Sequence, residues 1–131
     1  QKRPLKYIGF DGLGHQVRDC LHPQDLARML ILQLKAGRDE SKPAIVNLAG
    51  GSNASMSLRQ LSAWCAGRFG AHEVSTEAKD RPFDIPWMVL DSSLAQQAWG
   101  WQPERSLLSV LDELAEHADN HDDWLDISAP Y

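Results

Sequence analysis

The sequence lacks the features that would suit a membrane protein, a nucleic-acid binder or a disulfide-stabilised domain. Its 131 residues include only two cysteines, and its longest apolar run, residues 29–32, is far shorter than the roughly 20 residues that span a bilayer. The net charge of -5 argues against a general binder of nucleic acid or membrane surfaces, since both need a basic face. No signal peptide is recognisable, so we expect a cytoplasmic protein.

The motifs of several enzyme classes are also missing. The two tyrosines are Tyr7 and Tyr131, and neither is followed four residues later by a lysine. A glycine-rich dinucleotide loop is absent, because Val17 stands where Gly12 and Gly14 would need a third glycine. The G-x-S-x-G elbow of serine hydrolases does not occur either. We therefore predict no catalytic residue and no dinucleotide site within this chain.

Metal-binding patterns are weak. His117 and His121 are four residues apart, so they could face one ion, but exposed helix ends produce such pairs by chance. Cys20 and Cys65 lie in apolar surroundings and are expected to be core thiols. The glycine pair at residues 50–51 follows a strand-like run, where a plain turn is the simpler interpretation. We predict no metal site.

What the chain does contain is an alternation of strand-like and helix-like segments, with 43% hydrophobic and 24% charged residues. Strands are predicted at residues 5–10, 16–18 (as the hairpin partner of the first), 44–48, 73–76 and 85–90. Helix starts are predicted at Pro23, at the Ser57–Gln60 capping box, at Asp91 and at Ser106. The apolar face of the first helix would consist of Leu26, Met29, Leu30 and Leu34. The fold class is α/β, one small domain of short strands and about four helices over residues 1–131.

Two arginines in loops or at strand ends could bind phosphate. Arg18 stands just before a helix, and Arg81 just before a strand. A guanidinium group binds phosphate oxygens with two hydrogen bonds, so two arginines can clamp a diphosphate. Asp84, a pure acceptor when ionised, suits the hydroxyls of a ribose. The structural alternative is ion pairing, of Arg18 with Asp19 or Asp25 and of Arg81 with Asp84.

Six segments carry a family resemblance when they are taken in order. They are QVRDCLHPQDL (16–26), IVNLAGG (45–51), SMSL (55–58), RPFD (81–84), DSSL (91–94) and GWQP (100–103). In this order they resemble the extended short-chain dehydrogenase/reductases, the nucleotide-sugar epimerases and dehydratases, whose motifs read V-R-D-x-(I/L)-H, N-(I/L)-G-G, S-x-S-L, R-P-G-D, D-x-S-K-A and L-G-W-x-P. Each motif is weak by itself, but the ordered set covers nearly the whole chain.

The resemblance implies that this chain is the C-terminal, substrate-binding portion of such an enzyme. In the family, an N-terminal domain carries the glycine-rich NAD loop and the catalytic Tyr-x-x-x-Lys pair, and both are absent from this sequence. NAD is therefore expected in the full-length protein and not on this chain alone, and Gln1 would lie just before a substrate-side strand. Residues 14–19, GHQVRD, are most similar to the CDP-paratose (CDP-tyvelose) 2-epimerases, which implies a CDP-sugar as the ligand.

The resemblance also assigns roles to particular residues. Arg18 and Arg81 would hold the nucleotide diphosphate, and Asp84 the ribose. The backbone of three residues would lie along the base, with one side chain lining the same pocket: Lys6, Tyr7 and Ile8, and Gln16. Trp101 would be a packing residue.

The chain departs from the family pattern at four positions: His15 for a usual lysine, Phe83 for a glycine, Gln24 for a common acid and Ala49 for the first glycine of its motif. Of these, Phe83 could crowd the loop beside the diphosphate. Two other functions stay open. The chain could be a stand-alone nucleotide-binding or protein-interaction domain without catalysis, or it could belong to a sugar-nucleotide dehydratase or decarboxylase.

Overall fold

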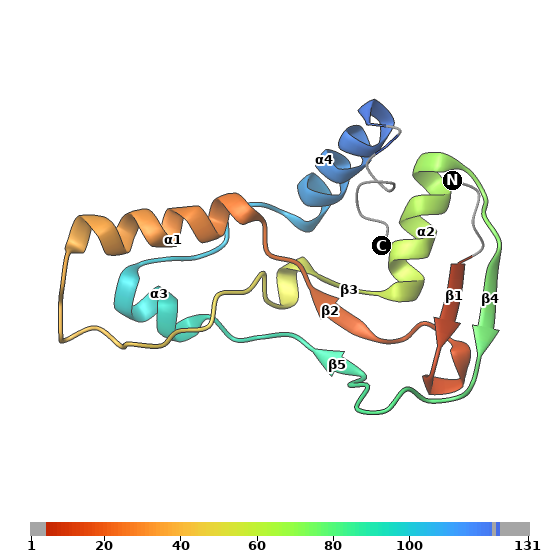
Figure 1. The fold of residues 1–131 in the computed structure, drawn as a ribbon, viewed down its shortest axis with the longest axis horizontal. Helices are drawn as coiled ribbons and strands as arrows, with labels where there is room; N and C mark the ends of the chain where they lie inside the picture. Colours follow the sequence, from red (N-terminus) through yellow and green to blue (C-terminus); the bar gives the residue numbers. More distant parts are fainter. Residues whose placement is uncertain (1–4, 122, 124–131) are drawn as a thin grey trace.

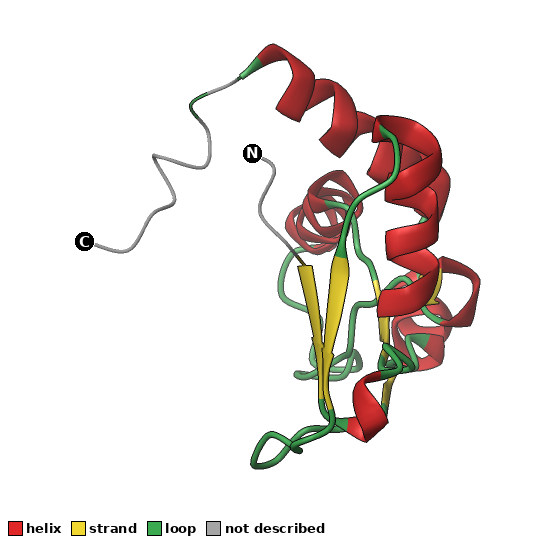
Figure 2. Ribbon diagram, turned by 90° about the vertical axis from the view of Figure 1, so that its right-hand side faces the viewer, coloured by secondary structure: helices red, strands yellow, loops and turns green. Residues whose placement is uncertain are grey.

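Residues 5–121 and 123 are described by the computed structural model, which contains two small β-sheets in this part of the chain. In the first sheet, β1 (Leu5–Ile8) and β4 (Val74–Glu77) run parallel, side by side (Figure 2). In the second, β2 (Val17–Asp19) lies between β3 (Ser55–Ser57), which is antiparallel to it, and β5 (Trp87–Met88), which is parallel. The predicted α/β class is confirmed.

The described residues also contain four α-helices: α1 (Pro23–Ala36), α2 (Leu58–Phe69), α3 (Ser93–Trp99) and α4 (Leu107–Asn120). Short 3-10 turns occur at Phe10–Gly12 and Ser52–Ala54. Figure 1 shows α1 and α3 at one end of an elongated molecule, and α2 with β1 and β4 at the other. None of the helices in the described residues has the length and apolar character needed to cross a membrane.

The predicted helix starts are confirmed at three of four positions, because capping depends on residues that are close in sequence. Ser57 and Gln60 form both halves of the capping box, and the Ser106 side chain accepts a hydrogen bond from the Ser109 amide. The α1 helix begins at Pro23 with His22 as its N-cap. The fourth start is shifted by one residue, since Ser92 is the N-cap of α3 and the Asp91 carboxylate instead accepts two hydrogen bonds from Ser93.

The predicted hairpin between residues 5–10 and 16–18 is wrong. The turn after β1 packs against β4 instead, and a Cβ at Gly12 would lie only 2.8 Å from the Thr76 Cβ. Gly12 also has a φ of 66°, a conformation that glycine adopts without strain. The turn therefore directs the chain away from β1, and β2 finds its partners in a different sheet.

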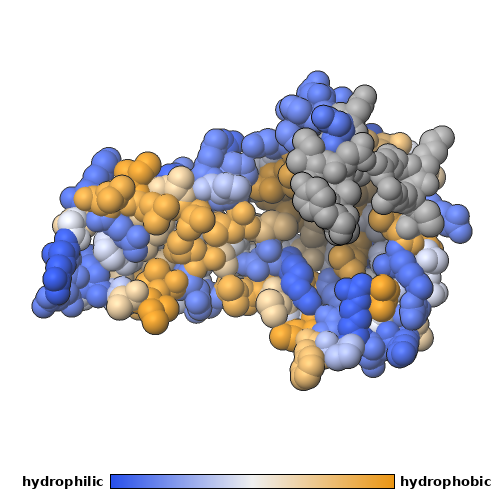
Figure 3. All heavy atoms as spheres, in the orientation of Figure 1, coloured by the Kyte–Doolittle hydropathy of each residue, from blue (hydrophilic) through white to orange (hydrophobic). Residues whose placement is uncertain are grey.

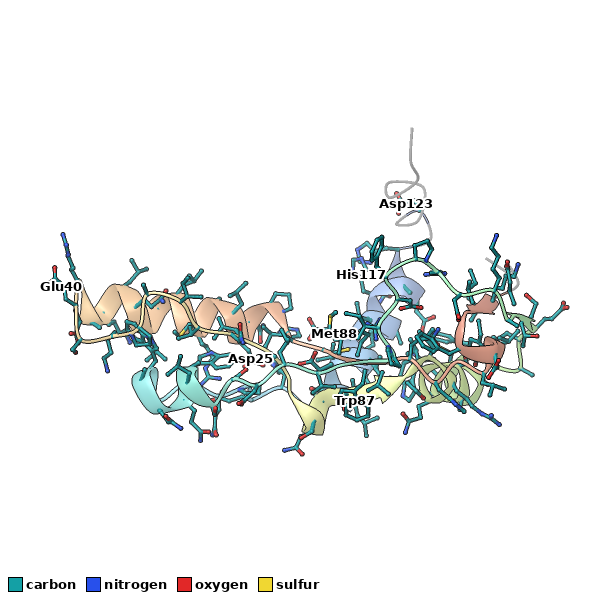
Figure 4. All side chains as sticks on the ribbon, turned by 90° about the horizontal axis from the view of Figure 1, so that it is seen from below. Asp25, Glu40, Trp87, Met88, His117 and Asp123 are labelled. Atoms are coloured by element: carbon teal, nitrogen blue, oxygen red, sulfur yellow. The ribbon has the colours of Figure 1, made fainter. Side chains whose placement is uncertain are left out.

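The predicted strand at residues 44–48 is also wrong. Its apolar, β-branched sequence favours extended backbone, but no strand of the described residues pairs with it, and Ile45 is 84% exposed. The strand predicted at 85–90 shortens to two residues for a related reason, because β2 is the single strand within residues 5–121 that pairs with β5. Figure 4 shows Trp87 and Met88 on opposite sides of this edge strand.

The core lies where the start of α1 meets the segment after α3. Trp101 is fully buried with Met29 and Ala95, which agrees with its predicted packing role, and its indole N–H donates to the Asp25 carbonyl over 2.8 Å. The Asp25 carboxylate accepts hydrogen bonds from the amides of Glu104 at 3.0 Å and Arg105 at 3.2 Å. Figure 4 marks Asp25 at this end of α1. A buried carboxylate thus ties the 101–105 segment to the helix.

The predicted apolar face of α1 is buried only at Met29. The other three side chains stay open to solvent: Leu26 44% exposed, Leu30 52% and Leu34 82%. Figure 3 shows apolar side chains gathered over the end of the molecule that contains α1 and α3. The described fold therefore leaves much apolar surface uncovered.

Candidate nucleotide-binding cleft

A cleft of about 210 Å³ lies between the two sheets and the loop that precedes β5. Seven residues line it: Lys6, Ile8, Gln16, Arg18, Leu58, Arg81 and Asp84. Three of them are cationic and one is a carboxylate, in a chain whose net charge is -5. A concentration of positive charge in a concave site favours an anionic ligand. A larger hollow lies along Leu30 and Leu34 of α1, and it belongs to the uncovered apolar surface.

Asp84 is the centre of the polar contacts in this cleft. Its carboxylate accepts from the Arg18 guanidinium at 3.2 Å and from the Ile85 amide at 2.9 Å, while the Gln16 amide group approaches it at 3.5 Å. The Gln16 Nε2 donates to the Ile8 carbonyl over 2.7 Å, which ties β1 to the start of β2. The Asp84 side chain is 15% exposed and that of Arg18 is 41% exposed, so guanidinium N–H groups remain open to the cleft.

Gln16 carries an unsatisfied acceptor in this network. The residue is 5% exposed, and its Oε1 atom is buried without a hydrogen-bond donor. Exchanging the amide oxygen and nitrogen would bring an oxygen against the Ile8 carbonyl, so the present orientation is the favourable one. A buried acceptor without a donor is rare in folded proteins and calls for an explanation.

The predicted ion-pair alternatives for Arg18 are wrong. Its partner is Asp84 and neither Asp19 nor Asp25, because those two carboxylates accept backbone amides elsewhere. The predicted ion pair between Arg81 and Asp84 is also wrong for the described residues, since the Asp84 carboxylate pairs with Arg18, and Arg81 and Asp84 share only a backbone hydrogen bond, from the Asp84 amide to the Arg81 carbonyl at 3.3 Å. Arg81 is exposed and lines the cleft together with Arg18.

Six of the seven residues predicted from the sequence meet in this cleft, and Tyr7 is the exception. Side chains alternate along a strand, so Tyr7 points away from the face that carries Lys6 and Ile8, and its ring lies beside Gly14. Leu58 was missed. It opens α2 immediately after the Ser57 cap, and its amide donates to the Gln16 carbonyl at 3.1 Å, a contact with no local sequence signal.

Phe83 does not crowd the cleft. Its side chain is 99% exposed, while Arg81 and Asp84 on either side of it both line the cleft. Phe83 therefore leaves Arg81 and Asp84 open to the cleft.

The cysteines and histidines form no second site in the described residues. Burial raises the pKa of both thiols, and the neighbouring Asp19 carboxylate adds to this effect at Cys20, so both are protonated at neutral pH. The rings of His117 and His121 stack at 4.0 Å, and no group of three or more potential metal ligands occurs in this part of the chain.

The glycine pair at residues 50–51 is not an open phosphate site. The Gly51 amide donates to the Asp19 carboxylate at 3.0 Å, so a negative charge already occupies the position of a phosphate. A Cβ at Gly50 would lie 1.9 Å from the Cys20 carbonyl oxygen, so this glycine is required for close packing. The glycine pair therefore serves packing and is not free to hold a phosphate.

Comparison with known proteins gives matches to solved structures alone. No protein-family model matches the chain. A search of curated protein sequences finds no match either. Four solved structures match with confidence, and all four hold NAD.

Three of the matches are nearly equal in quality. MoeE5 in complex with UDP-glucuronic acid and NAD is 26% identical with a TM-score of 0.64, over 80% of this chain and 33% of that one. UDP-glucose-4-epimerase from Stenotrophomonas maltophila, with NAD and formylated UDP-arabinopyranose, is 28% identical with a TM-score of 0.64, over 81% and 32%. UDP-glucuronic acid 4-epimerase from Bacillus cereus, with UDP-glucuronic acid and NAD, is 21% identical with a TM-score of 0.65, over 81% and 32%.

The chain therefore spans about a third of the length of the structures it matches. These comparisons support the predicted family relation at the level of fold. The chain has the fold of one third of an extended short-chain dehydrogenase/reductase of the nucleotide-sugar epimerase type.

Proposed function

We propose that this chain is the nucleotide-sugar-binding portion of an NAD-dependent epimerase, and that the cleft holds the nucleoside diphosphate. The observation that carries the proposal is the grouping of Arg18 and Arg81 with Asp84 in one cleft, in a fold shared with nucleotide-sugar epimerases. Two guanidinium groups suit a diphosphate, and a carboxylate beside them suits ribose hydroxyls.

Each polar group in the cleft has a role in this proposal. Arg18 is held by Asp84 and by the Val17 carbonyl at 2.7 Å, so its planar group is oriented before a ligand arrives. Such preorganisation reduces the entropy lost on binding. The buried Oε1 of Gln16 lacks a donor, and a small rearrangement on binding would let an N–H or O–H group of the nucleoside supply one. The backbone of residues 6–8 would lie along the base.

The chain would supply binding energy and not the reacting groups. Its sequence has no Tyr-x-x-x-Lys pair, so in this proposal hydride transfer would take place on an NAD-binding domain and not on this chain. Binding energy from the nucleotide and diphosphate, remote from the reacting carbon, would position the sugar for that reaction. The isolated chain is expected to be inactive.

The uncovered apolar surface supports a missing partner domain. Leu30 and Leu34 of α1 are exposed, and so is Ile45 in the segment after the helix, whereas Val46 and Leu48 pack against the core. Exposed apolar side chains that gather on one part of a surface suit packing against another domain. We propose that an NAD-binding domain covers this surface. A stand-alone interaction domain would use the same surface, so sequencing the coding region upstream of Gln1 separates the two. A glycine-rich loop and a later Tyr-x-x-x-Lys are expected there, and their absence would favour the stand-alone domain.

The substrate is proposed more narrowly as a CDP-sugar, of the CDP-paratose 2-epimerase type, on the basis of residues 14–19. The similar solved structures hold UDP-sugars, so titration of the chain with CDP and UDP tests this choice directly. An epimerase, a dehydratase and a decarboxylase of this family would share the cleft, and product analysis of the full-length protein distinguishes them. The cytoplasmic location stays a prediction.

The test of the proposal is calorimetric titration of the wild-type chain and of Arg18→Ala with CDP, UDP and inorganic pyrophosphate. Loss of charged hydrogen bonds to the diphosphate should weaken all three by about tenfold or more. Arg38→Ala is the matched control, because Arg38 pairs with Glu40 on a distant exposed loop. Equal affinities of the wild-type chain and Arg18→Ala would disprove the site assignment.

A further inference from the structure

Phe83 occupies a backbone position that ordinarily calls for glycine. The hydrogen bond from the Asp84 amide to the Arg81 carbonyl closes a turn with Pro82 and Phe83 at its centre. The φ of Phe83 is 61°, and a proline followed by a residue of positive φ defines a type II turn. Glycine is preferred at the third position of such a turn, because an L-residue is strained there.

No packing of the Phe83 ring offsets the backbone strain at this position. Its side chain is 99% exposed, the highest value among the large apolar side chains of the described residues. Phe10 also has a positive φ, of 48°, but it is half-buried and its amide donates to Asp80 at 2.9 Å. The ring of Phe83 therefore has neither burial nor packing to offset its backbone conformation.

The location of Phe83 suggests what its ring contacts. It stands one residue from Asp84 and two from Arg81, and both of these line the cleft. The turn hydrogen bond joins Arg81 to Asp84, so Phe83 lies in a closed turn between two residues that line the cleft. An exposed aromatic ring beside a phosphate-binding arginine can pack against the flat face of a nucleobase.

We infer that Phe83 packs on the nucleoside of the bound nucleoside diphosphate and acts as a positioning residue for it. This inference rests on the proposed function of the cleft. It assigns the ring to the organic half of the ligand and leaves the diphosphate to Arg18 and Arg81. A docked protein domain as the partner of the ring is the competing outcome.

The test compares wild type, Phe83→Gly and Phe83→Tyr in the 131-residue chain, titrated with CDP, UDP and inorganic pyrophosphate. Phe83→Gly should weaken CDP and UDP by about tenfold, the loss expected for one base–aromatic contact. The pyrophosphate affinity of Phe83→Gly should equal that of the wild type. Phe83→Tyr, which keeps an aromatic ring, should bind CDP and UDP as tightly as the wild type does. Phe83→Gly should also raise the melting temperature, because glycine adopts the turn conformation without strain.

The outcomes separate this inference from the proposed function. If Arg18→Ala weakens every ligand while Phe83→Gly weakens none, the cleft assignment stands and the role of Phe83 is wrong. If Phe83→Gly weakens pyrophosphate as much as CDP, the ring orders the arginine loop and does not contact the nucleoside, which also overturns the inference. If the wild-type chain binds no nucleotide, both proposals fail together.

Discussion

Two arginine–aspartate pairs in this protein have the same length and different surroundings. Arg28 and Asp25 in the core, and Arg18 and Asp84 in the cleft, both meet at 3.2 Å. The Asp25 side chain is 2% exposed and its oxygens also accept two backbone amides. The Asp84 side chain is 15% exposed and lies beside an arginine that is 41% exposed.

The difference lies in what surrounds each pair. Around Asp25, hydrogen-bonding capacity is used within the protein, so removing the carboxylate leaves buried donors without a partner. The two arginines are similarly exposed, at 41% for Arg18 and 37% for Arg28. Arg28 pairs with a second carboxylate, Glu104, whereas Arg18 has no second carboxylate partner among the described residues, so its N–H groups remain open to an anion. The distance within an ion pair therefore does not indicate whether the pair binds a ligand. The hydrogen-bonding groups of the pair that stay unused within the protein do indicate it.

The largest loss of stability is expected when Asp25 is replaced, and the same change at Asp84 serves for comparison. Asp25→Asn should lower the free energy of unfolding by about 3 kcal/mol, because its amide group would face a backbone N–H donor in a buried site. Asp84→Asn is the matched variant, and it should lower the same quantity by about 1 kcal/mol or less, since the Asp84 side chain is 15% exposed against 2% for Asp25. Urea denaturation of both variants measures the difference. Equal losses would contradict the contrast drawn between the two pairs.

An intermediate loss of stability is expected in the segment that connects the core to the cleft. Gly50→Ala would place a Cβ 1.9 Å from the Cys20 carbonyl oxygen, in the segment that connects Arg18 to α1. We expect a loss of about 2 kcal/mol in unfolding free energy. Gly67→Ala is the control, because nothing lies near that position in α2, and it should stabilise the chain by up to about 1 kcal/mol. Thermal unfolding compares them, and a stable Gly50→Ala variant would show that this packing can relax.

The smallest effect is expected at the surface pair of Lys6 and Glu77, which links β1 to β4. The hydrogen bond and charge of Lys6 lower the pKa of Glu77. The stabilisation from Glu77 is therefore present above its ordinary pKa and is lost as the pH falls through the lowered pKa. Melting temperatures of wild type and Glu77→Gln should differ slightly at neutral pH and converge in acid or in high salt. A difference that grows in acid would contradict this account.

How much could be predicted depended on the range of each interaction. The caps at Ser57 and Ser106 were predictable, because the groups that form them lie within three residues. The partners of β1 and β2 were not, since Leu5 pairs with Val74 and Val17 with Trp87 across long separations in sequence. The strand expected at residues 44–48 did not form, because β-propensity needs a neighbouring edge to pair with.

The candidate site also divides into features that the sequence predicted and features that depend on contacts between distant residues. The residue types and their order along the chain pointed to Arg18, Arg81 and Asp84 before any geometry was known. The choice of Asp84 as the partner of Arg18 came from the tertiary structure, as did the place of Leu58 in the cleft.

The sequence by itself determined the α/β alternation, most helix starts and the chemical character of the cleft, because these follow from local spacing and from side-chain chemistry. Only the tertiary structure decided which strands pair, which aspartate is buried at Trp101 and which apolar faces remain uncovered. These depend on contacts between residues far apart in the chain, and the preferences of short segments do not encode them. The apolar face of α1 is the clearest example of this limit. The spacing of its leucines predicts a buried face, but in the described fold these side chains remain exposed.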